Sequence, residues 1–304
     1  MFKKVLCYNI NMDTIKAKAY AKLNLSLEIL GQRPDGYHDI CSVFHAVTLA
    51  DELEFTLRGD GRIVLDANEP HLPTDERNLA VKAALLLKQE YRIDQKCGVT
   101  VNLRKQIPVG AGLGGGSSDA ACSLLSLNRL WNNNKASVEE LSSLGSQIGS
   151  DVPFFLAATT ALVKGRGEVI EPLAVTQRYH FVIIYPGFGV STAWAYKTFK
   201  KELTNGREYS KILASHCLNG EPPDRLAPLF HNDFEPTVIK AHPRIAEAKS
   251  DLLAAGALGA LMSGSGSSVF GIFSGPDASL SGWRRVQAKW PRSFTAASVP
   301  DTSE

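Results

Sequence analysis

Cysteine is scarce in this sequence and shows none of the patterns that give it a chemical role. The chain of 304 residues holds five cysteines, an odd number with no C-x-x-C pair of the kind that binds zinc or exchanges disulfides. We therefore expect reduced, mostly buried thiols at Cys7, Cys41, Cys97, Cys122 and Cys217. Metal-ligand spacing is also missing among the histidines, so we expect no metal site built at His45, His71, His180, His216 or His242.

Long hydrophobic runs and an excess of one charge are missing as well. No apolar run approaches the length of a membrane span, and the apolar stretch after Lys4 ends at Asn9, too soon for a signal peptide. We therefore expect a cytoplasmic protein without membrane contact. Lys and Arg number 33 against 31 Asp and Glu, a formal net charge of +2, which gives no reason to expect nucleic-acid binding. The expected partners are small molecules bound at a local site, and the chain itself is expected to be a monomer or homodimer.

The length and composition predict a globular chain of two domains. A single hydrophobic core rarely grows beyond about 250–300 residues. A chain of 304 residues with 44% hydrophobic and 21% charged side chains therefore fits two buried interiors. We place the boundary near Thr176, which gives an N-terminal domain of residues 13–175 and a C-terminal domain of residues 176–304.

The N-terminal part of the sequence has the pattern of β-strands. In residues 23–29 apolar and polar side chains alternate, which predicts a strand with one buried face. A second run, residues 42–49, predicts a strand that ends before Asp51. Residues 54–57 and 62–65 predict a further hairpin across the glycines between them.

Helices and strands alternate further along the chain. Apolar residues at helical spacing predict a helix over residues 78–91, and residues 99–103 predict the strand that follows. After a glycine-rich segment, Ser117 or Ser118 is expected to cap another helix. Residues 181–185 predict a buried strand. The apolar face of the capped helix would include Ala121, Leu124, Leu125 and Leu130.

The glycine-rich segment is the clearest functional signal. Five of the seven residues from Gly110 to Gly116 are glycine, so the backbone can turn tightly and approach a ligand closely. Several amide N–H groups can then point at one anion, and the start of the next helix favours a phosphate at the same place. Two serines add hydroxyls for phosphate or a bound Mg²⁺. The residues expected to hold phosphate are Pro108, Val109, Gly110, Ala111, Gly112, Leu113, Gly114, Gly115, Gly116, Ser117 and Ser118.

Three other interpretations of this segment are weaker. A P-loop would end in Gly-Lys-Ser/Thr, whereas here Ser117 follows Gly116 directly. A dinucleotide fingerprint would place an acidic residue about 20 residues further on, at the end of a second strand. Residues 130–134 show no such strand. A flexible surface turn would not normally separate a strand from a capped helix.

Residues 108–121 resemble the second motif of the superfamily of galactokinases, homoserine kinases, mevalonate kinases and phosphomevalonate kinases. A closer resemblance, to the 4-diphosphocytidyl-2-C-methyl-D-erythritol kinase family, extends from Ile15 to about Phe273. It departs from the family at Ser150, where alanine is more usual. Its segments, in the order of the family, are residues 21–25, 31–38, 149–154, 231–236 and 262–268.

This resemblance implies an α+β fold of two domains with the substrates in the cleft between them. The N-terminal domain would be a β-rich kinase domain carrying the glycine-rich phosphate loop, and the C-terminal domain a ferredoxin-like α/β sandwich. The implied reaction transfers a phosphoryl group from ATP, with Mg²⁺, to the 2-hydroxyl of 4-diphosphocytidyl-2-C-methyl-D-erythritol, a step of non-mevalonate isoprenoid synthesis. In this resemblance Asp151 accepts the proton of the hydroxyl, and Lys22 keeps that carboxylate charged.

The resemblance, together with the local sequence pattern, indicates residues around the two substrates. Tyr37 and His38 would hold the cytosine, with Tyr196 as a second ring over the base or a core residue. Asn24 lies two residues from Lys22 on a strand, so both side chains face the same side, and it could bond the acceptor or be an exposed strand residue. The adenine would lie beside Asn78 and Leu79, and residues 263–267 would close the phosphate pocket or form a plain turn.

Two rival functions follow from the same residues. Another kinase of the superfamily, for homoserine or mevalonate, would share the glycine loop but would not need the Gly-Tyr-His segment at residues 36–38. A nucleotide-binding protein without catalysis would not need both Lys22 and Asp151. The presence of both residues favours an enzyme.

Overall fold

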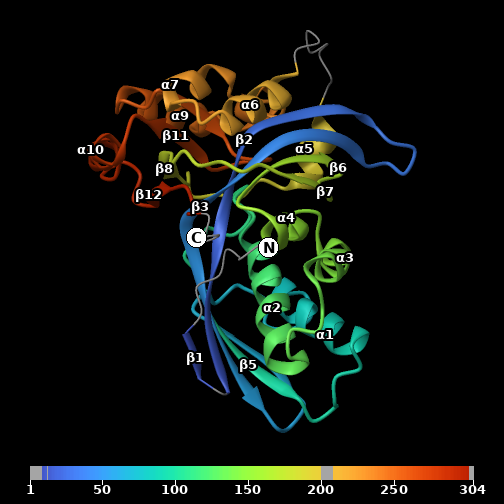
Figure 1. Ribbon diagram of the computed structural model, residues 1–304. Helices are drawn as coiled ribbons and strands as arrows, with labels where there is room; N and C mark the ends of the chain where they lie inside the picture. Colours follow the sequence, from blue (N-terminus) through green and yellow to red (C-terminus); the bar gives the residue numbers. More distant parts are fainter. Residues whose placement is uncertain (1–8, 12, 200–207, 301–304) are drawn as a thin grey trace.

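The computed structural model describes residues 9–11, 13–199 and 208–300. Over these residues the strands form two sheets, of eight and of four strands, and helices pack on both (Figure 1). The larger sheet extends along the length of the molecule, and the smaller sheet lies with its helices at one end of it. The expected α+β fold class is confirmed.

The larger sheet is mixed, with the order β1-β2-β3-β5-β4. β6 joins it beside β3 and is followed by β7, while β9 joins it beside β2. The central position of β2 and β3 places the middle of both strands deep in the molecule. The strands of this sheet are β1 (Asn9–Asn11), β2 (Thr14–Gln32), β3 (His38–Arg58), β4 (Ile63–Ala67), β5 (Gly98–Arg104), β6 (Thr160–Gly165), β7 (Val169–Pro172) and β9 (His231–Asn232).

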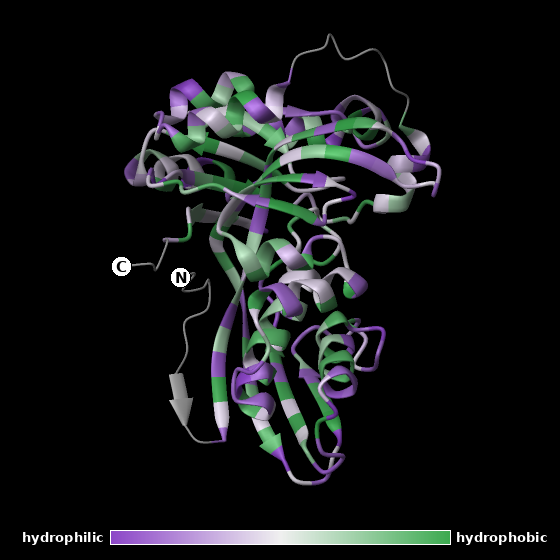
Figure 2. Ribbon diagram, turned by 45° about the vertical axis from the view of Figure 1, so that its right-hand side comes forward, coloured by the Kyte–Doolittle hydropathy of each residue, from purple (hydrophilic) through white to green (hydrophobic). Residues whose placement is uncertain are grey.

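Helices α1 to α4 pack against one side of the larger sheet. Figure 2 shows hydrophobic stretches on these helices and on the strands beside them, and their buried side chains form one core cluster with β3 and β5. The predicted helix over residues 78–91 is confirmed, and Asn78 caps it by accepting a hydrogen bond from the N–H of Ala80 at 2.9 Å. The four helices are α1 (Leu79–Glu90), α2 (Gly115–Asn132), α3 (Val138–Ile148) and α4 (Val152–Ala157).

β2 and β3 form a long antiparallel pair of 19 and 21 residues. The prediction that residues 23–29 bury only one face is wrong, because Asn24, Ser26 and Glu28 are buried as well as the apolar residues. The C-terminal part of the chain covers the second face. There the Ser26 hydroxyl meets that of Ser210 at 2.8 Å, and Glu28 accepts the N–H of Ser210 at 2.8 Å.

The predicted hairpin between residues 54–57 and 62–65 is also wrong. β3 pairs antiparallel with β5, and β4 pairs parallel with the other edge of β5. β5 takes the inner position because its apolar side chains Val99, Val101 and Leu103 are all buried. β4 is left at the sheet edge, where Val64 is exposed.

The predicted end of a strand before Asp51 is wrong for a different reason. β3 continues through this residue, and the carboxylate of Asp51 is fully buried. It accepts hydrogen bonds from the backbone N–H groups of Gln106 and Ile107, at 2.6 and 2.9 Å, and from the ammonium group of Lys105. An acidic side chain can therefore remain inside the sheet, because its charge is paired and its oxygens are bonded.

The smaller sheet is antiparallel with the order β10-β11-β8-β12. The chain passes through one strand, several helices, two strands, one helix and a last strand, which is the split arrangement of ferredoxin-like domains. The expected fold of the C-terminal part is confirmed, and β8 matches the strand predicted at residues 181–185. The elements are β8 (His180–Ile184), α5 (Thr192–Thr198), α6 (Tyr209–Leu218), α7 (Pro223–Leu226), η1 (Ala227–Leu229), α8 (Glu235–Ala241), α9 (Arg244–Ala254), β10 (Gly259–Met262), β11 (Val269–Phe273), α10 (Pro276–Val286) and β12 (Ser293–Ala297).

The division expected near Thr176 falls in the connection between β7 and β8. The chain beyond this point still contributes β9 to the larger sheet, where it pairs in parallel with β2. One core cluster combines Leu23 and Leu25 of β2 with Phe181 and Phe270 of the smaller sheet. The two parts thus share an interior along β2, and the boundary between residues 175 and 176 stays a prediction.

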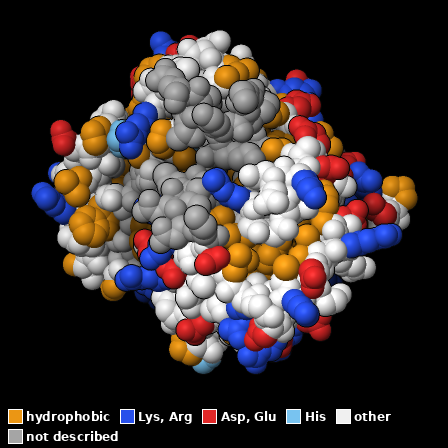
Figure 3. Space-filling model, turned by 60° about the horizontal axis from the view of Figure 1, so that its bottom comes forward, with side chains coloured by type: hydrophobic (Ala, Val, Ile, Leu, Met, Phe, Trp, Pro, Cys, Tyr) orange, Lys and Arg blue, Asp and Glu red, His pale blue; other side chains and the backbone are white. Residues whose placement is uncertain are grey.

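Several expectations from composition can be compared with the described residues. Their four cysteines are free, with Cys41, Cys122 and Cys217 buried and Cys97 partly exposed, while Cys7 lies outside this part of the chain. No helix in the described segments combines the length and the apolar character needed to cross a bilayer. On the face shown in Figure 3, basic and acidic side chains are interspersed, in keeping with the net charge of +2.

His45 is a buried histidine that joins three parts of the chain. Its Nδ1 lies 2.8 Å from the Thr160 hydroxyl of β6, and its Nε2 lies 2.8 Å from the Ser298 hydroxyl near the end of the described chain. Burial lowers the pKa of His45 to about 4 from its usual 6.5. The folded protein therefore holds this imidazole neutral at a pH where the unfolded chain protonates it.

We expect this histidine to make the protein less stable in mild acid. Between pH 6.5 and about 4 the unfolded state binds a proton that the native state does not, so the free energy of unfolding should fall as the pH falls. A pKa shift of this size in one group lowers the free energy of unfolding by about 3 kcal/mol once the pH has fallen through this range. Urea unfolding at a series of pH values should show that the free energy of unfolding falls less steeply with decreasing pH in His45→Gln than in the unmodified protein. An equal pH dependence in the two proteins would contradict the prediction.

Candidate active site

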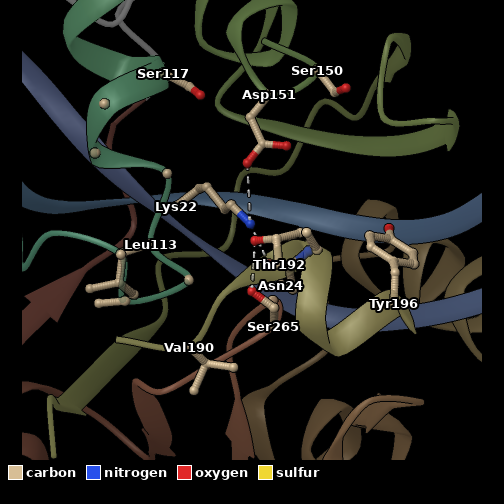
Figure 4. A pocket seen from close by; sticks show the side chains of 18 of the residues that line it. Lys22, Asn24, Leu113, Ser117, Ser150, Asp151, Val190, Thr192, Tyr196 and Ser265 are labelled. Atoms are coloured by element: carbon tan, nitrogen blue, oxygen red, sulfur yellow. Dashed lines mark hydrogen bonds and ion pairs between the residues drawn. The ribbon is translucent and has the colours of Figure 1, made fainter. Parts of the chain in front are cut away.

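A cavity of about 1200 Å³ lies where the glycine loop meets the middle of β2, α5 and residues 264–265. Side chains from both parts of the chain point into it (Figure 4). Every residue expected to hold ATP lines this cavity except Ser118, which is buried in α2. The expected catalytic and acceptor residues Lys22, Asn24, Tyr37, His38, Asp151 and Tyr196 line it as well.

The glycine loop has a conformation that few side chains would allow. Gly110, Gly112 and Gly114 adopt positive φ angles of 66°, 77° and 71°. Left-handed residues alternating with others turn successive N–H groups toward one side, which makes a concave site for an anion. Among the described groups, none accepts a hydrogen bond from the N–H groups of residues 110–117. These donors therefore remain free for a ligand.

The carbonyl groups of the same loop are bonded to the surrounding protein. Those of Gly110 and Ala111 accept the N–H groups of Val190 and Ser268, at 3.3 and 3.1 Å. The carbonyl of Gly112 accepts the Ser263 hydroxyl at 2.9 Å, and that of Leu113 accepts the N–H of Lys22 at 3.0 Å. The chain therefore fixes the loop through its acceptors and leaves its donors facing the cavity.

The expectation that Ser117 or Ser118 caps α2 is wrong. The helix begins at Gly115, and Gly114 is the cap residue, because its left-handed backbone turns the loop directly into the helix. Both serines therefore lie inside the first turn. Ser117 still lines the cavity, but Ser118 is only 2% exposed and has no access to a phosphate there.

Lys22 and Asp151 lie together at the centre of the cavity (Figure 4). The Lys22 Nζ is 3.6 Å from the Asp151 Oδ2 and 4.4 Å from the centre of the Phe44 ring. Lys22 is buried, so its charge lies inside the protein. Burial lowers the pKa of Lys22, and the charge of Asp151 offsets part of this shift.

Asp151 precedes α4 in the position of an N-cap, yet its side chain makes no capping hydrogen bond. Pro153 in the first turn lowers the need for one, because proline has no N–H group. The carboxylate is 30% exposed and points into the cavity beside Lys22. Its oxygens are therefore available to a substrate.

Asn24 is buried, which excludes the interpretation as an exposed strand residue. Its side-chain oxygen accepts a hydrogen bond from the Lys22 ammonium, and its amide nitrogen donates to the Ser42 hydroxyl at 3.0 Å. Lys22 and Asn24 therefore do lie on one side of β2, as predicted. With both ends of the amide bonded, the contacts of Asn24 orient Lys22.

Aromatic rings line the end of the cavity expected to hold cytosine. The His38 and Tyr196 rings stack with centres 5.0 Å apart and planes at 21°. Tyr37 is 56% exposed, and the Arg166 guanidinium lies 4.9 Å from its ring centre. Tyr196 also meets the edge of Phe234 at 4.9 Å, so it both lines the cavity and packs against the core. Burial, with the nearby charge of Asp151, raises the pKa of Tyr196 to about 12.

Several lining residues were not expected from the sequence. Arg166 stands between two glycines in the β6–β7 turn, a position that would have marked it as exposed and well placed for a ligand. Thr192 and Ser265 both line the cavity, and their hydroxyl groups hydrogen-bond to each other at 3.0 Å. Below the loop, Lys105 bonds Asp119 at 2.8 Å, and both side chains are nearly inaccessible to solvent. Nothing in the local pattern separates this buried pair from surface charges.

Burial of Asp119 has a marked effect on its acidity. Desolvation raises the pKa of Asp119, although the charge of Lys105 opposes the shift. One of its oxygens, Oδ1, has no hydrogen-bond partner in the described structure. The floor of the cavity therefore contains a carboxyl group whose charged form is disfavoured by burial.

Comparison with known proteins gives this geometry a family. Residues 78–159 match the model of the GHMP kinases N terminal domain, and residues 216–292 match that of the GHMP kinases C terminal. A 4-diphosphocytidyl-2-C-methyl-D-erythritol kinase of Gloeobacter violaceus is 44% identical over 266 residues, covering 86% of each chain. That of Pelotomaculum thermopropionicum is 42% identical, covering 91% of this chain and 94% of its own. The chain belongs to this kinase family.

Solved structures agree with this assignment. A crystal structure of 4-(cytidine 5'-diphospho)-2C-methyl-D-erythritol kinase aligns with a TM-score of 0.79 and 34% identity, covering 94% of this chain and all of its own. A homoserine kinase from Cytophaga hutchinsonii has a TM-score of 0.74 at 21% identity, covering 96% and 97%, and shares the fold. The expectation of an ATP-dependent kinase of isoprenoid precursor synthesis is confirmed by these relatives.

Gly116 allows a test of the phosphate loop that spares the fold. A Cβ added there would lie 3.5 Å from Leu79 Cδ1, an ordinary contact, whereas one at Gly114 would lie 2.9 Å from the Phe155 ring. We expect Gly116→Ala to leave the melting temperature almost unchanged. Its methyl group at the mouth of the loop should raise the KM for ATP by roughly 10-fold, because the phosphates must approach the backbone closely.

The matched control for this variant is Gly31→Ala, whose added Cβ meets nothing within 4 Å and which does not line the cavity. Steady-state kinetics with ATP varied should separate the two variants. Equal KM values for ATP in both would place the phosphates elsewhere.

Proposed function

We propose that this chain transfers the terminal phosphoryl group of ATP to the 2-hydroxyl of 4-diphosphocytidyl-2-C-methyl-D-erythritol, with Asp151 as the base. The main support is the Lys22–Asp151 pair at 3.6 Å, which stands between the glycine loop and the aromatic end of one cavity. A phosphoryl donor held by the loop and an alcohol held at the rings would meet at this pair.

Asp151 is suited to take the proton of the acceptor hydroxyl as the new bond forms. Its carboxylate makes no capping bond and is partly exposed in the cavity. Phosphoryl transfer passes through a loose transition state, so positioning and charge stabilisation matter most. The acceptor hydroxyl is tertiary and hindered, and the enzyme must therefore fix its oxygen in line with the phosphorus atom.

Lys22 supplies a fixed positive charge beside the reacting oxygens. Asn24 and the face of Phe44 hold its ammonium group in place, and burial removes competing water. A cation at this position can stabilise negative charge on the transferring group. The free N–H groups of the glycine loop add further donors for the same charge.

The oxygen donors present fit a Mg²⁺ ion that is bound mainly through the phosphates of ATP. Ser117 and Asp151 extend their side chains toward the same space, and both carry the hard oxygen atoms that this ion prefers (Figure 4). The described residues contain no cluster of three or more His, Cys, Asp or Glu side chains suited to a metal. We assign Ser117, beside the phosphates themselves, as the protein group that would hold it, and keep Asp151 as the base. Bound Mg²⁺ neutralises phosphate charge.

The aromatic end of the cavity supports a cytidine-bearing acceptor. Tyr37, His38 and Tyr196 offer ring faces for stacking, and the imidazole can also bond the polar edge of the base. Arg166 places a positive charge beside Tyr37, where an acceptor with two phosphates needs one.

The cytoplasmic location and the monomeric or homodimeric state are proposed on the sequence alone.

Asp151→Asn tests the base directly. The amide keeps the volume of the side chain but cannot accept a proton, so turnover should fall by roughly 100-fold or more. ATP affinity and thermal stability should stay close to those of the unmodified protein. Asp224→Asn, an exposed substitution in α7, serves as the control in the same coupled ADP-release assay. Near-normal turnover of Asp151→Asn would remove Asp151 from the mechanism.

Tyr37→Ala tests the acceptor specificity. The exposed ring touches the acceptor end of the cavity only, so its loss should raise the KM for the cytidine-bearing alcohol and leave the KM for ATP almost unchanged. Stacking on a base is worth about 1 to 3 kcal/mol. Methylerythritol phosphate, which lacks the base, should be a very poor substrate. Preference for homoserine or mevalonate would refute the acceptor and leave the kinase class intact.

A further inference from the structure

Apart from Phe234, which packs against Tyr196, residues 231–235 have no part in the chemistry described so far, although they lie next to the strand that carries Lys22. Residues 231 and 232 form β9, which pairs in parallel with Ser26 and Leu27 of β2. Asp233 strengthens this attachment, since its N–H donates to the Leu27 carbonyl at 3.0 Å and its Oδ2 accepts the N–H of Ile29 at 2.6 Å. The segment is thus fixed to β2 on one side.

Asn232 connects this segment to the second glycine-serine loop. Its amide nitrogen donates to the carbonyls of Met262 and Gly264, at 2.7 and 2.8 Å, and these two carbonyls flank Ser263. Its side-chain oxygen accepts the N–H of Phe234 at 2.9 Å. Asn232 is only 4% exposed and does not line the cavity, so it cannot touch a substrate there.

Ser263 carries the connection on to the phosphate loop. Its hydroxyl donates to the Gly112 carbonyl at 2.9 Å and accepts the N–H of Asn24 at 3.2 Å. Ser263 and Asn24 are both buried, so these bonds are shielded from water. A continuous series of hydrogen bonds therefore runs from Asn232 through Ser263 to the loop and to the residue that orients Lys22.

We infer that Asn232 is a positioning residue that fixes where the phosphate loop lies relative to Lys22. It holds the backbone on both sides of Ser263, and Ser263 holds the carbonyl of Gly112 at the middle of the loop. Loss of its two donors would leave two carbonyls unbonded and let Ser263 move. The inference rests on the proposed assignment of the ATP phosphates to this loop.

The test compares Asn232→Ala, Ser263→Ala and the double variant by steady-state kinetics with ATP varied. We expect each single variant to lower kcat/KM for ATP by roughly 10-fold or more, while the KM for the alcohol changes little. Because both residues act through the same bond to Gly112, the double variant should lose no more than the worse single variant. A residue that only supports the fold would give independent, multiplying losses.

Asn128→Ala is the matched control. Asn128 is 3% exposed, bonds the backbone of Ala136 with both ends of its amide, and does not line the cavity. Its loss should lower the melting temperature to a similar degree and leave kcat/KM for ATP within about 3-fold of the unmodified protein.

Asn232→Asp carries the test if the alanine variant does not fold, because it keeps the size of the side chain. Its ionised carboxylate faces two carbonyls without a donor, and protonation restores one donor. The loss in kcat/KM should therefore shrink, relative to the unmodified protein, as the pH is lowered. A loss independent of pH would overturn the inference.

Three further results would also overturn the inference. One is a kcat/KM for ATP of Asn232→Ala within 3-fold of the unmodified protein, and another is a loss equal to that of Asn128→Ala. The third is a loss in the double variant that equals the product of the two single losses. Failure of the underlying phosphate assignment gives a different result. In that case Gly116→Ala would leave the KM for ATP unchanged, whatever Asn232→Ala does.

Discussion

The attachment of the glycine loop by its carbonyl groups is the constraint on which the site depends. Four successive carbonyls, from Gly110 to Leu113, are bonded by groups from three different segments of the chain. A backbone whose acceptors are fixed has little freedom to turn its donors away. The donors are therefore organised before a ligand arrives, and no reorganisation cost is added when charge develops on a phosphate.

The same attachment explains why the chemistry lies at the junction of the two parts of the chain. One of the four groups, the N–H of Lys22, belongs to the strand that also presents the lysine side chain. Two others, from Ser263 and Ser268, come from the connection between strands of the smaller sheet. The distance between the phosphate loop and the Lys22–Asp151 pair is thus fixed by β2 within the larger sheet and by the packing of the smaller sheet against it.

Local signals in the sequence were sufficient for much of this arrangement. The helix after Asn78 and the strand before the loop follow from apolar spacing and a cap residue, and the loop follows from its glycines. The errors arose where the neighbour decides the outcome. The alternation in residues 23–29 could not show that a second layer covers Asn24, and the hairpin prediction could not show that β5 would insert beside β3. Burial of Lys105 and Asp119 likewise depends on contacts far apart in the chain.

The length of the β2–β3 pair has a consequence for how the enzyme can move. Both strands cross from one core cluster into the next, so the two parts of the chain are joined by a broad twisted ribbon, in contrast to a narrow linker. A large hinge rotation between the two parts would break hydrogen bonds between β2 and β3. Closure over bound substrates should therefore come from side chains and short connections, such as the β6–β7 turn with Arg166, while the backbone frame stays still.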